Sequence, residues 1–212
     1  LSDYQTSYLE SGESVIGVGA TYQLHNSRLL LGATVPIKEQ TGHTIGSRKT
    51  IVSSLEYGDP LVQSITLMAG LSEDKDNLLG STGANAFSLT GAKTTTAFTA
   101  IKAQKQLLDN FSLTGMATLA NTNMTSPSNS FVDSASDVKS SSVALIANMR
   151  NLTDEDQLSL FVNQPNRVDD GSMAIKIASL ADSNRNISQT IKHIDLESSS
   201  RQLNYGLSYR KD

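Results

Sequence analysis

Ser172, in the run Gly171-Ser172-Met173-Ala174, is the serine to be considered first as a nucleophile. Nucleophilic catalysis by serine needs a histidine base within hydrogen-bond reach and a carboxylate that orients the base. The residues around Ser172 instead alternate between apolar and polar types, and Asp169-Asp170-Gly171 predicts a hairpin turn between two strands. No neighbour supplies the base, so we expect Ser172 to be structural and the chain to contain no catalytic residue.

The three histidines are the other candidates for a base or a metal ligand. His25 and His43 fall in predicted turns or loops, and His193 lies in a segment that alternates with Ile191. A three-histidine metal site would require these separated residues to converge, and the chain has no cysteine that could supply a thiolate ligand. Solvated histidines are the favoured interpretation, and we predict neither a metal site nor a bound cofactor.

Two further patterns have a chemical interpretation that their context disfavours. Ser72–Asn77 gathers several carboxylates but lacks the glycine and distal glutamate of an EF-hand, so we expect a solvated loop there and a polar turn at Thr153–Asp156. Gly17-x-Gly19 lies inside an alternating segment instead of opening a helix, which disfavours dinucleotide binding. Glycines in a strand favour close packing or a bend in the sheet.

Length, charge and hydropathy exclude several classes of protein. A chain of 212 residues can form one domain with a full core. Its net charge of −4, without a basic tract, gives no reason to expect nucleic-acid binding. No apolar run approaches the roughly 18 residues of a membrane-spanning helix, which leaves a β-barrel open. Because the chain starts at Leu1 without an initiator methionine or a leader, we expect residues 1–212 to be a fragment of a longer, processed protein.

Period-two alternation runs through most of the chain and predicts half-buried antiparallel strands. We count about eleven such segments, or about twelve if Tyr4–Leu9 is included. The Thr-rich segment Thr94–Leu107 favours a strand over a helix. The clearest of the other segments are Ile16–Leu24, Leu29–Ile37, Ile51–Tyr57, Ile65–Leu71, Phe111–Leu119, Val143–Met149 and Leu203–Tyr209.

The connections between these segments are of two kinds. Tight turns are predicted at His25-Asn26-Ser27, Gly58-Asp59-Pro60 and Leu108-Asp109-Asn110. Long polar connections are predicted at Lys38–Lys49, Ser72–Lys93, Asn121–Lys139 and Ala181–Asn186. Short turns that alternate with long loops are typical of outer-membrane barrels.

The second face of each predicted strand carries small uncharged residues such as Thr21, Thr114 and Ser142. A soluble sheet usually shows lysine, glutamate and arginine to water at such positions, yet only 18% of this chain is charged. Small polar residues suit a barrel lumen, with the apolar face towards lipid. Aromatic content is low at 5%, without tryptophan. A thin aromatic girdle could come from Tyr22, Tyr57, Phe111, Tyr205 and Tyr209.

One block of the sequence resembles a known family. Asp156-x-Leu158-x-Leu160-x-Val162-x-Gln164-Pro165-x-Arg167-Val168-x-x-Gly171-Ser172 is similar to a segment near the C-terminus of secreted subtilisin-like (subtilase) serine peptidases of Gram-negative bacteria. Leu78–Ser81 and the closing Leu203–Arg210 also fit that region, which lies downstream of the catalytic domain and is similar to autotransporter barrels. Barrels of this type end on an aromatic residue, whereas this chain continues beyond Tyr209 with Arg210-Lys211-Asp212.

The resemblance implies one antiparallel up-and-down β-barrel of about twelve strands over residues 1–212, seated in the outer membrane. Its role would be to anchor or export an upstream passenger or peptidase domain, without a catalytic site of its own. The implied partners are outer-membrane lipid, the passenger and the barrel-assembly machinery. The alternative is a soluble β-sandwich or barrel, secreted or periplasmic, that serves as a binding or assembly module.

Overall fold

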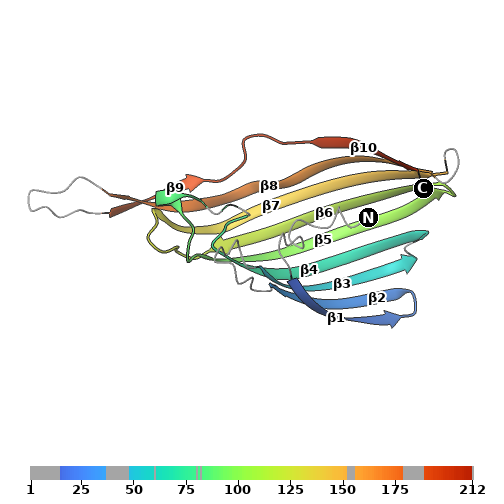
Figure 1. Ribbon diagram of the computed structural model, residues 1–212, viewed down its shortest axis with the longest axis horizontal. Helices are drawn as coiled ribbons and strands as arrows, with labels where there is room; N and C mark the ends of the chain where they lie inside the picture. The colour runs from blue at the N-terminus through green and yellow to red at the C-terminus, as the bar shows by residue number, and fades with distance from the viewer. Residues whose placement is uncertain are drawn as a thin grey trace, which may run out of the picture.

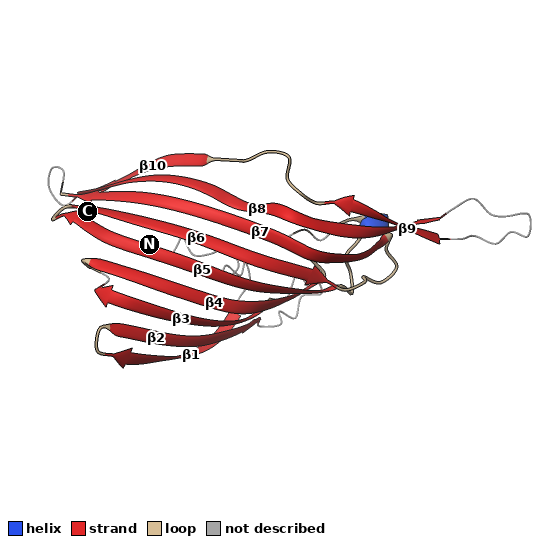
Figure 2. Cartoon of the chain, turned by 180° about the vertical axis from the view of Figure 1, so that it is seen from behind, coloured by secondary structure: helices blue, strands red, loops and turns tan. Residues whose placement is uncertain are grey.

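The computed structural model describes residues 15–36, 48–59, 61–79, 81, 83–151, 156–178 and 189–211. Ten antiparallel strands occupy most of these residues, and the only helix among them is the single 3-10 turn Asn85–Phe87. Figure 1 shows one long curved sheet, and Figure 2 shows the same sheet from behind. Within this part of the chain, no helix is long and apolar enough to cross a membrane. The prediction of an all-β antiparallel fold is confirmed.

The order of the strands in the sheet follows their order in the chain. They are β1 (Val15–Leu24), β2 (Ser27–Pro36), β3 (Lys49–Asp59), β4 (Gln63–Lys75), β5 (Lys93–Leu108), β6 (Phe111–Met124), β7 (Val132–Arg150), β8 (Asp156–Ala178), β9 (Gln189–Asp195) and β10 (Asn204–Lys211). Each strand from β1 to β8 pairs with the next, and β10 pairs with the first part of β8. β9 pairs with the last part of β8. The sheet is therefore an up-and-down meander with β1 at one edge and β9 and β10 at the other.

The two ends of the sheet differ in the length of their connections. At one end, here called the turn end, His25-Asn26 joins β1 to β2 and Asp109-Asn110 joins β5 to β6. At the other, the loop end, residues 76–92 join β4 to β5 and residues 125–131 join β6 to β7. The tight turns predicted at His25-Asn26-Ser27 and Leu108-Asp109-Asn110 are confirmed. At Gly58-Asp59-Pro60, β3 extends through Asp59, and Pro60 lies outside the described residues. The predicted connections Lys38–Lys49 and Ala181–Asn186 lie largely or wholly outside the described residues.

The alternation of the sequence becomes two chemically different faces, because successive side chains of a strand point to opposite sides. On β4, Ile65 and Leu67 are exposed on one face, which we call the apolar face. Ser64 and Ser72 are buried on the other, which we call the polar face. Cross-strand pairs keep this division, as where Leu55 of β3 lies opposite Leu67. A slip of one residue would exchange the faces, so the pattern fixes the register.

The hairpin predicted at Asp169-Asp170-Gly171 is wrong. β8 runs without a break through this point, and its partner β7 continues beside it. The register shifts here, Gly171 adopts a φ of 142° and Asp137 on β7 a φ of 51°. A glycine after two aspartates is as compatible with a β-bulge as with a turn, and pairing with β7 selects the bulge.

The strand count and the closure also differ from the prediction of a closed barrel with about twelve strands. The described residues form ten strands in an open sheet. The continuity of β8 removes one strand from the predicted count, and Tyr4–Leu9 lies outside the described residues. Figure 1 shows β1 and β10 at opposite edges of the sheet.

Two predicted loops are shorter than expected because strand alternation continues into polar sequence. β4 extends through Lys75, and β6 extends to Met124 while β7 starts at Val132. Thr122 and Val138 in these extensions are fully buried. A run of Ser, Thr and Asn can therefore remain a strand when every second side chain is covered.

The hydrophobic core is small and lies at the loop end. There the connection 76–92 folds back over the ends of β6 and β7, so that Leu78 and Leu89 pack with Met124 and Val132. Leu79 of the same connection contacts a second cluster around Phe98 on the polar face of β5. The connection thus covers the polar face at this end of the sheet.

Candidate functional site

The apolar face is a chemically distinct surface that extends over several neighbouring strands. One row of direct cross-strand partners runs from Leu29 on β2 through Leu55, Leu67 and Ile101 to Ala117 on β6. The large side chains of this face are about half exposed: Leu55 42%, Leu67 51%, Ile101 47%, Leu119 64%, Leu145 49%, Leu160 49% and Leu207 65%. Exposed apolar patches of this extent mark a binding surface or a membrane-facing surface.

The apolar face is uncharged over a width that matches a bilayer. On β5 its only charged residues are Lys93 near the loop end and Lys105 near the turn end. At a rise of about 3.3 Å per residue, these two positions lie roughly 40 Å apart along the strand. At the tilt of about 45° that membrane strands adopt, that length corresponds to a thickness of roughly 28 Å. The apolar band of outer-membrane barrels is about 25 Å tall.

Aromatic residues lie near both ends of the sheet. Tyr22, Tyr57 and Tyr209 lie on strand segments close to the turn end and are more than half exposed. At the loop end, the rings of Phe87 and Phe131 meet edge to face with centroids 6.1 Å apart. Aromatic side chains are favoured where an apolar region meets water.

The polar face is lined by hydroxyl and amide groups that bond to one another. The hydroxyls of Thr96 and Thr122 lie 2.9 Å apart, and Ser159 Oγ donates to Asn148 Oδ1 at 2.7 Å. Aromatic rings also lie on this face, each over a glycine of the neighbouring strand that leaves space for the ring. A Cβ at Gly70, opposite Phe98, would lie 2.4 Å from its ring. Small residues therefore allow this face to be closely packed.

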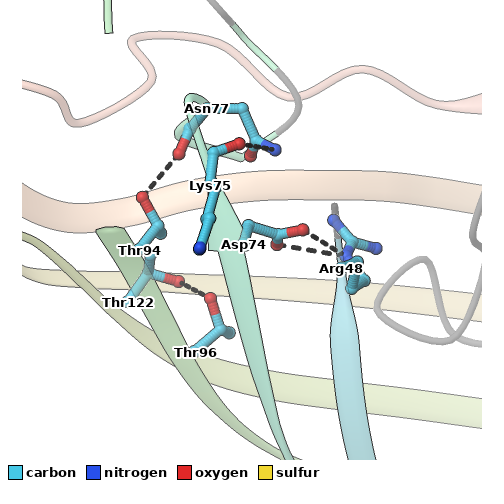
Figure 3. A network of polar contacts seen from close by, with 7 residues as sticks. All are labelled: Arg48, Asp74, Lys75, Asn77, Thr94, Thr96 and Thr122. Atoms are coloured by element: carbon cyan, nitrogen blue, oxygen red, sulfur yellow. Dashed lines mark hydrogen bonds and ion pairs between the residues drawn. The ribbon is translucent and has the colours of Figure 1, made fainter. Parts of the chain in front are cut away.

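A buried ion pair stabilises the loop end of the polar face (Figure 3). Arg48 Nε donates to both carboxylate oxygens of Asp74, at 2.9 and 3.0 Å. Nearby, Thr94 Oγ1 donates to the backbone carbonyl of Asn77, whose own side-chain amide donates to the carbonyl of Lys75. The Thr94–Asn77 bond attaches the start of the 76–92 connection to β5, and the Arg48–Asp74 pair joins the end of β4 to the residue before β3.

The carboxylates of Ser72–Asn77 are occupied by protein groups. Asp74 binds Arg48, Glu73 binds Lys93 Nζ at 2.8 Å, and Asp76 accepts from the backbone amide of Gly91. The hydrogen bond from Lys93 lowers the pKa of Glu73. The expectation of a solvated loop is wrong for this segment, because Asp74 and Asn77 are buried.

Another ion pair crosses the β7–β8 ladder beyond the uncharged band, on the loop side. Lys139 Nζ lies 2.8 Å from Asp170 Oδ2, and both side chains are exposed. The hydrogen bond from Lys139 lowers the pKa of Asp170, and the carboxylate in turn raises the pKa of Lys139. The pair lies one residue from the Gly171 bulge.

Ser172 lies in a strand, opposite Asp195 of β9, while His193 lies opposite Ala174. With Asp137 and Asp170, these side chains line a polar hollow of about 430 Å³. Sequence analysis did not bring Ser172 and His193 together, because the pairing of β8 with β9 leaves no signal near Ser172. Within the described residues, no hydrogen bond joins Ser172 to His193, and Asp195 Oδ1 accepts from the backbone amide of Glu197 instead.

The remaining candidates are placed apart from one another. His25 lies in the exposed β1–β2 turn with a φ of 38°, and His43 and residues 153–155 lie outside the described residues. Asp156 begins β8, is buried, and accepts from the Tyr209 hydroxyl at 3.2 Å. In the part of the chain that the structure describes, no three His, Asp or Glu side chains are arranged to hold a metal ion.

Comparison with protein-family models, curated proteins and solved structures finds no match to this chain.

Proposed function

We propose that this chain is the outer-membrane β-barrel domain of a secreted subtilase-like protein, and that it anchors or helps to export an upstream passenger. The uncharged apolar face carries this proposal: it crosses the whole sheet and has the width of a bilayer. In this function, lipid covers the apolar face, and the sheet closes around the polar face. The chain contributes no catalytic residue.

The geometry supports anchoring by a simple energetic argument. Each large apolar side chain that passes from water into lipid gains roughly 1.5–3 kcal/mol when fully covered. The large side chains of the apolar face are about half exposed, so a substantial part of this free energy is gained only when lipid or protein covers them. Several hydroxyl and amide groups of the opposite face bond to one another, and a polar lining suits a barrel lumen.

The connection 76–92 supports an anchor more than an open channel. It lies over the polar face at the loop end, with Leu79 packed towards Phe98. Passage of a polypeptide along that face would require this connection to move. The barrel-assembly machinery would be the partner during insertion, and the passenger the partner afterwards.

Fractionation and detergent dependence test the proposed function. We expect the expressed chain to sediment with outer membranes, to resist carbonate extraction, and to aggregate when detergent is withdrawn, because its apolar face is then exposed to water. A folded, monodisperse monomer in plain buffer would overturn the proposal and favour a soluble binding or assembly module, in which protein covers the apolar face.

A further inference from the structure

Four charged residues gather where β3, β4 and β5 reach the loop end. Lys49 begins β3, Lys75 ends β4 and Lys93 begins β5. Strand pairing places Lys49 opposite Glu73 of β4, and Lys75 opposite Lys93. Because residues two apart on a strand share a face, Glu73 and Lys75 lie side by side, and all four side chains belong to one patch. We call this patch the lysine cluster.

The lysine cluster borders the apolar face directly. Ile51 and Leu71 are cross-strand partners on that face and are 66% and 55% exposed. Lys49 and Glu73 are the next residues on the same face, about 7 Å further towards the loop end. In an outer-membrane barrel the longer loops are extracellular. In the proposed orientation the cluster therefore lies where the hydrocarbon of the outer leaflet meets its headgroups.

The charges of the lysine cluster do not balance. Lys93 Nζ lies 2.8 Å from Glu73 Oε2, whereas within the described residues neither Lys49 nor Lys75 makes an ion pair or a side-chain hydrogen bond. The hydrogen bond from Lys93, followed by the charges of Lys93, Lys49 and Lys75, lowers the pKa of Glu73. One carboxylate is thus shared by three lysines, and two positive charges remain. Like charges directly opposite each other, as at Lys75 and Lys93, destabilise a sheet.

The carboxylates that adjoin Glu73 and Lys75 in the chain do not restore the balance. Asp74 lies on the opposite face and binds Arg48. Asp76 accepts from the backbone amide of Gly91 in the 76–92 connection. An anion from outside the described chain is therefore needed to neutralise the cluster.

Other lysines at the loop end are each matched by one carboxylate. Lys139 lies 2.8 Å from Asp170, and Lys176 lies 2.9 Å from Asp133. These pairs share the loop end with the lysine cluster but carry no excess charge, which makes them suitable controls for it.

We propose that the lysine cluster binds the phosphate monoester of an outer-leaflet lipid headgroup, an inference that rests on the proposed function and deepens it. Lysine binds phosphate as a point charge, and a phosphate monoester carries about −1.5 to −2 at neutral pH, which matches the excess of two. A phosphodiester carries a single charge and would leave the cluster half neutralised. A lipid is favoured over free phosphate because its acyl chains would cover the adjoining Ile51 and Leu71.

Lipid binding to the full chain in dodecyl maltoside micelles tests this site, with native mass spectrometry as the measurement. The probe is dioleoyl phosphatidic acid, a phosphate monoester. We expect it to bind more tightly than dioleoyl phosphatidylglycerol, a diester, and far more tightly than dioleoyl phosphatidylcholine, which is neutral overall. Equal affinity for the three lipids would overturn the proposal. Displacement of the bound lipid by an equimolar amount of inorganic phosphate would also overturn it, because the site would then recognise a free ion.

Two double variants remove the same charge from the same end of the sheet. Lys49→Gln with Lys75→Gln should weaken the binding of phosphatidic acid roughly 25-fold, from about fivefold for each lysine near a lipid surface. Lys139→Gln with Lys176→Gln should leave it nearly unchanged, since those lysines already have carboxylate partners. Equal losses in the two double variants would refute a defined site and indicate attraction by net charge.

Glu73→Gln gives an independent test with the opposite sign. It removes the carboxylate that competes with the phosphate and releases Lys93, so phosphatidic acid should bind about fivefold more tightly. Circular dichroism confirms that each variant is folded. Unchanged or weaker binding by a folded Glu73→Gln variant would contradict the proposal, whatever the stability of the lysine variants.

Fractionation of the natural chain separates this inference from the proposed function. If the chain sediments with outer membranes and resists carbonate extraction but shows no preference for phosphatidic acid, the headgroup site alone fails. If the chain is a soluble monomer without detergent, the outer-membrane function fails. The cluster would then face no leaflet, and the headgroup proposal would be withdrawn with it.

Discussion

Asp74 carries its charge into the most enclosed part of the polar face, where its side chain is only 7% exposed. Arg48 compensates this charge through two contacts from one nitrogen. A buried charge is tolerated when it is paired, and the removal of one partner costs far more than the pair itself contributes. At the residue scale, stability therefore depends on a few enclosed polar contacts, whereas exposed pairs such as Lys139–Asp170 contribute less.

Asp74→Ala should lower the free energy of unfolding by about 3 kcal/mol, the lower end of the range for a broken buried pair, because Arg48 is partly exposed. Because the chain has no tryptophan, urea unfolding followed by circular dichroism measures this free energy. Glu73→Gln is the matched control, since it breaks the neighbouring but more exposed pair with Lys93. Equal losses for the two variants would contradict the importance given to burial.

Lys139→Gln should raise the pKa of Asp170 towards the ordinary aspartate value of about 3.9, because the hydrogen bond from Lys139 is what chiefly lowers it. Because the pKa of Asp170 is lower in the folded state, its carboxylate stabilises the fold at pH values above the ordinary aspartate pKa. This contribution is lost as the pH falls through the lowered pKa. Carboxyl-carbon NMR titration measures the shift. An unchanged pKa in the variant would show that another group controls Asp170.

β8 shows what determines an element of this protein. The alternation within β8 predicts two strands, but β7 pairs with β8 along nearly the whole length of β8. The pairing continues across the register shift near Gly171. There an ideal Cβ would lie 2.6 Å from the Cα of Val138, so only glycine fits the bulge. The bulge lies directly before the part of β8 that pairs with β9, at Ser172–Ala178.

Gly171→Ala should lower the free energy of unfolding by about 1–3 kcal/mol, because alanine is strained at a φ of 142° and its Cβ would contact backbone. Gly115→Ala is the control, since a Cβ there would lie 3.9 Å from its nearest neighbour, a side-chain atom of Leu145. Denaturant unfolding of both variants decides the matter. A loss at Gly115 as large as that at Gly171 would refute the bulge requirement.

At the scale of the whole molecule, the described part of the chain is one sheet with an apolar face and a polar face. Its apolar face is continuous from β1 to β10, and its polar face is covered at the loop end by the connection 76–92. Such a sheet is incomplete alone, since exposed apolar surface and two open edges both favour association. Lipid on the apolar face would cover the exposed apolar surface.

Leu145→Arg should cost roughly 2–4 kcal/mol of folding free energy in the membrane, as a charge does on the lipid-facing side at mid-depth. Ala144→Arg should cost less, because Ala144 lies on the polar face opposite Asn163, whose Oδ1 has no hydrogen-bond partner in the described structure. Unfolding in lipid vesicles measures both. Equal costs would contradict the assignment of the two faces.

The sequence by itself determined the strands and their faces, as at Ile65–Leu71, because the alternation of side chains along a strand is a local property. It also located the tight turns at His25-Asn26 and Asp109-Asn110, since asparagine and aspartate favour turns. Its errors, at Asp169–Gly171 and at Ser72–Asn77, fall where a local pattern fits two structures equally well.

Only the tertiary structure decided between those alternatives. The bulge at Gly171, the burial of Asp74 and the approach of His193 to Ser172 each depend on a partner strand or segment distant in the sequence. β1 and β10 run in the same direction because the number of strands between them is odd. The hairpin predicted at Asp169-Asp170-Gly171 would have divided β8 into two strands and made that number even. Long-range pairing selects among locally equivalent conformations, and no local pattern records which partner a strand will meet.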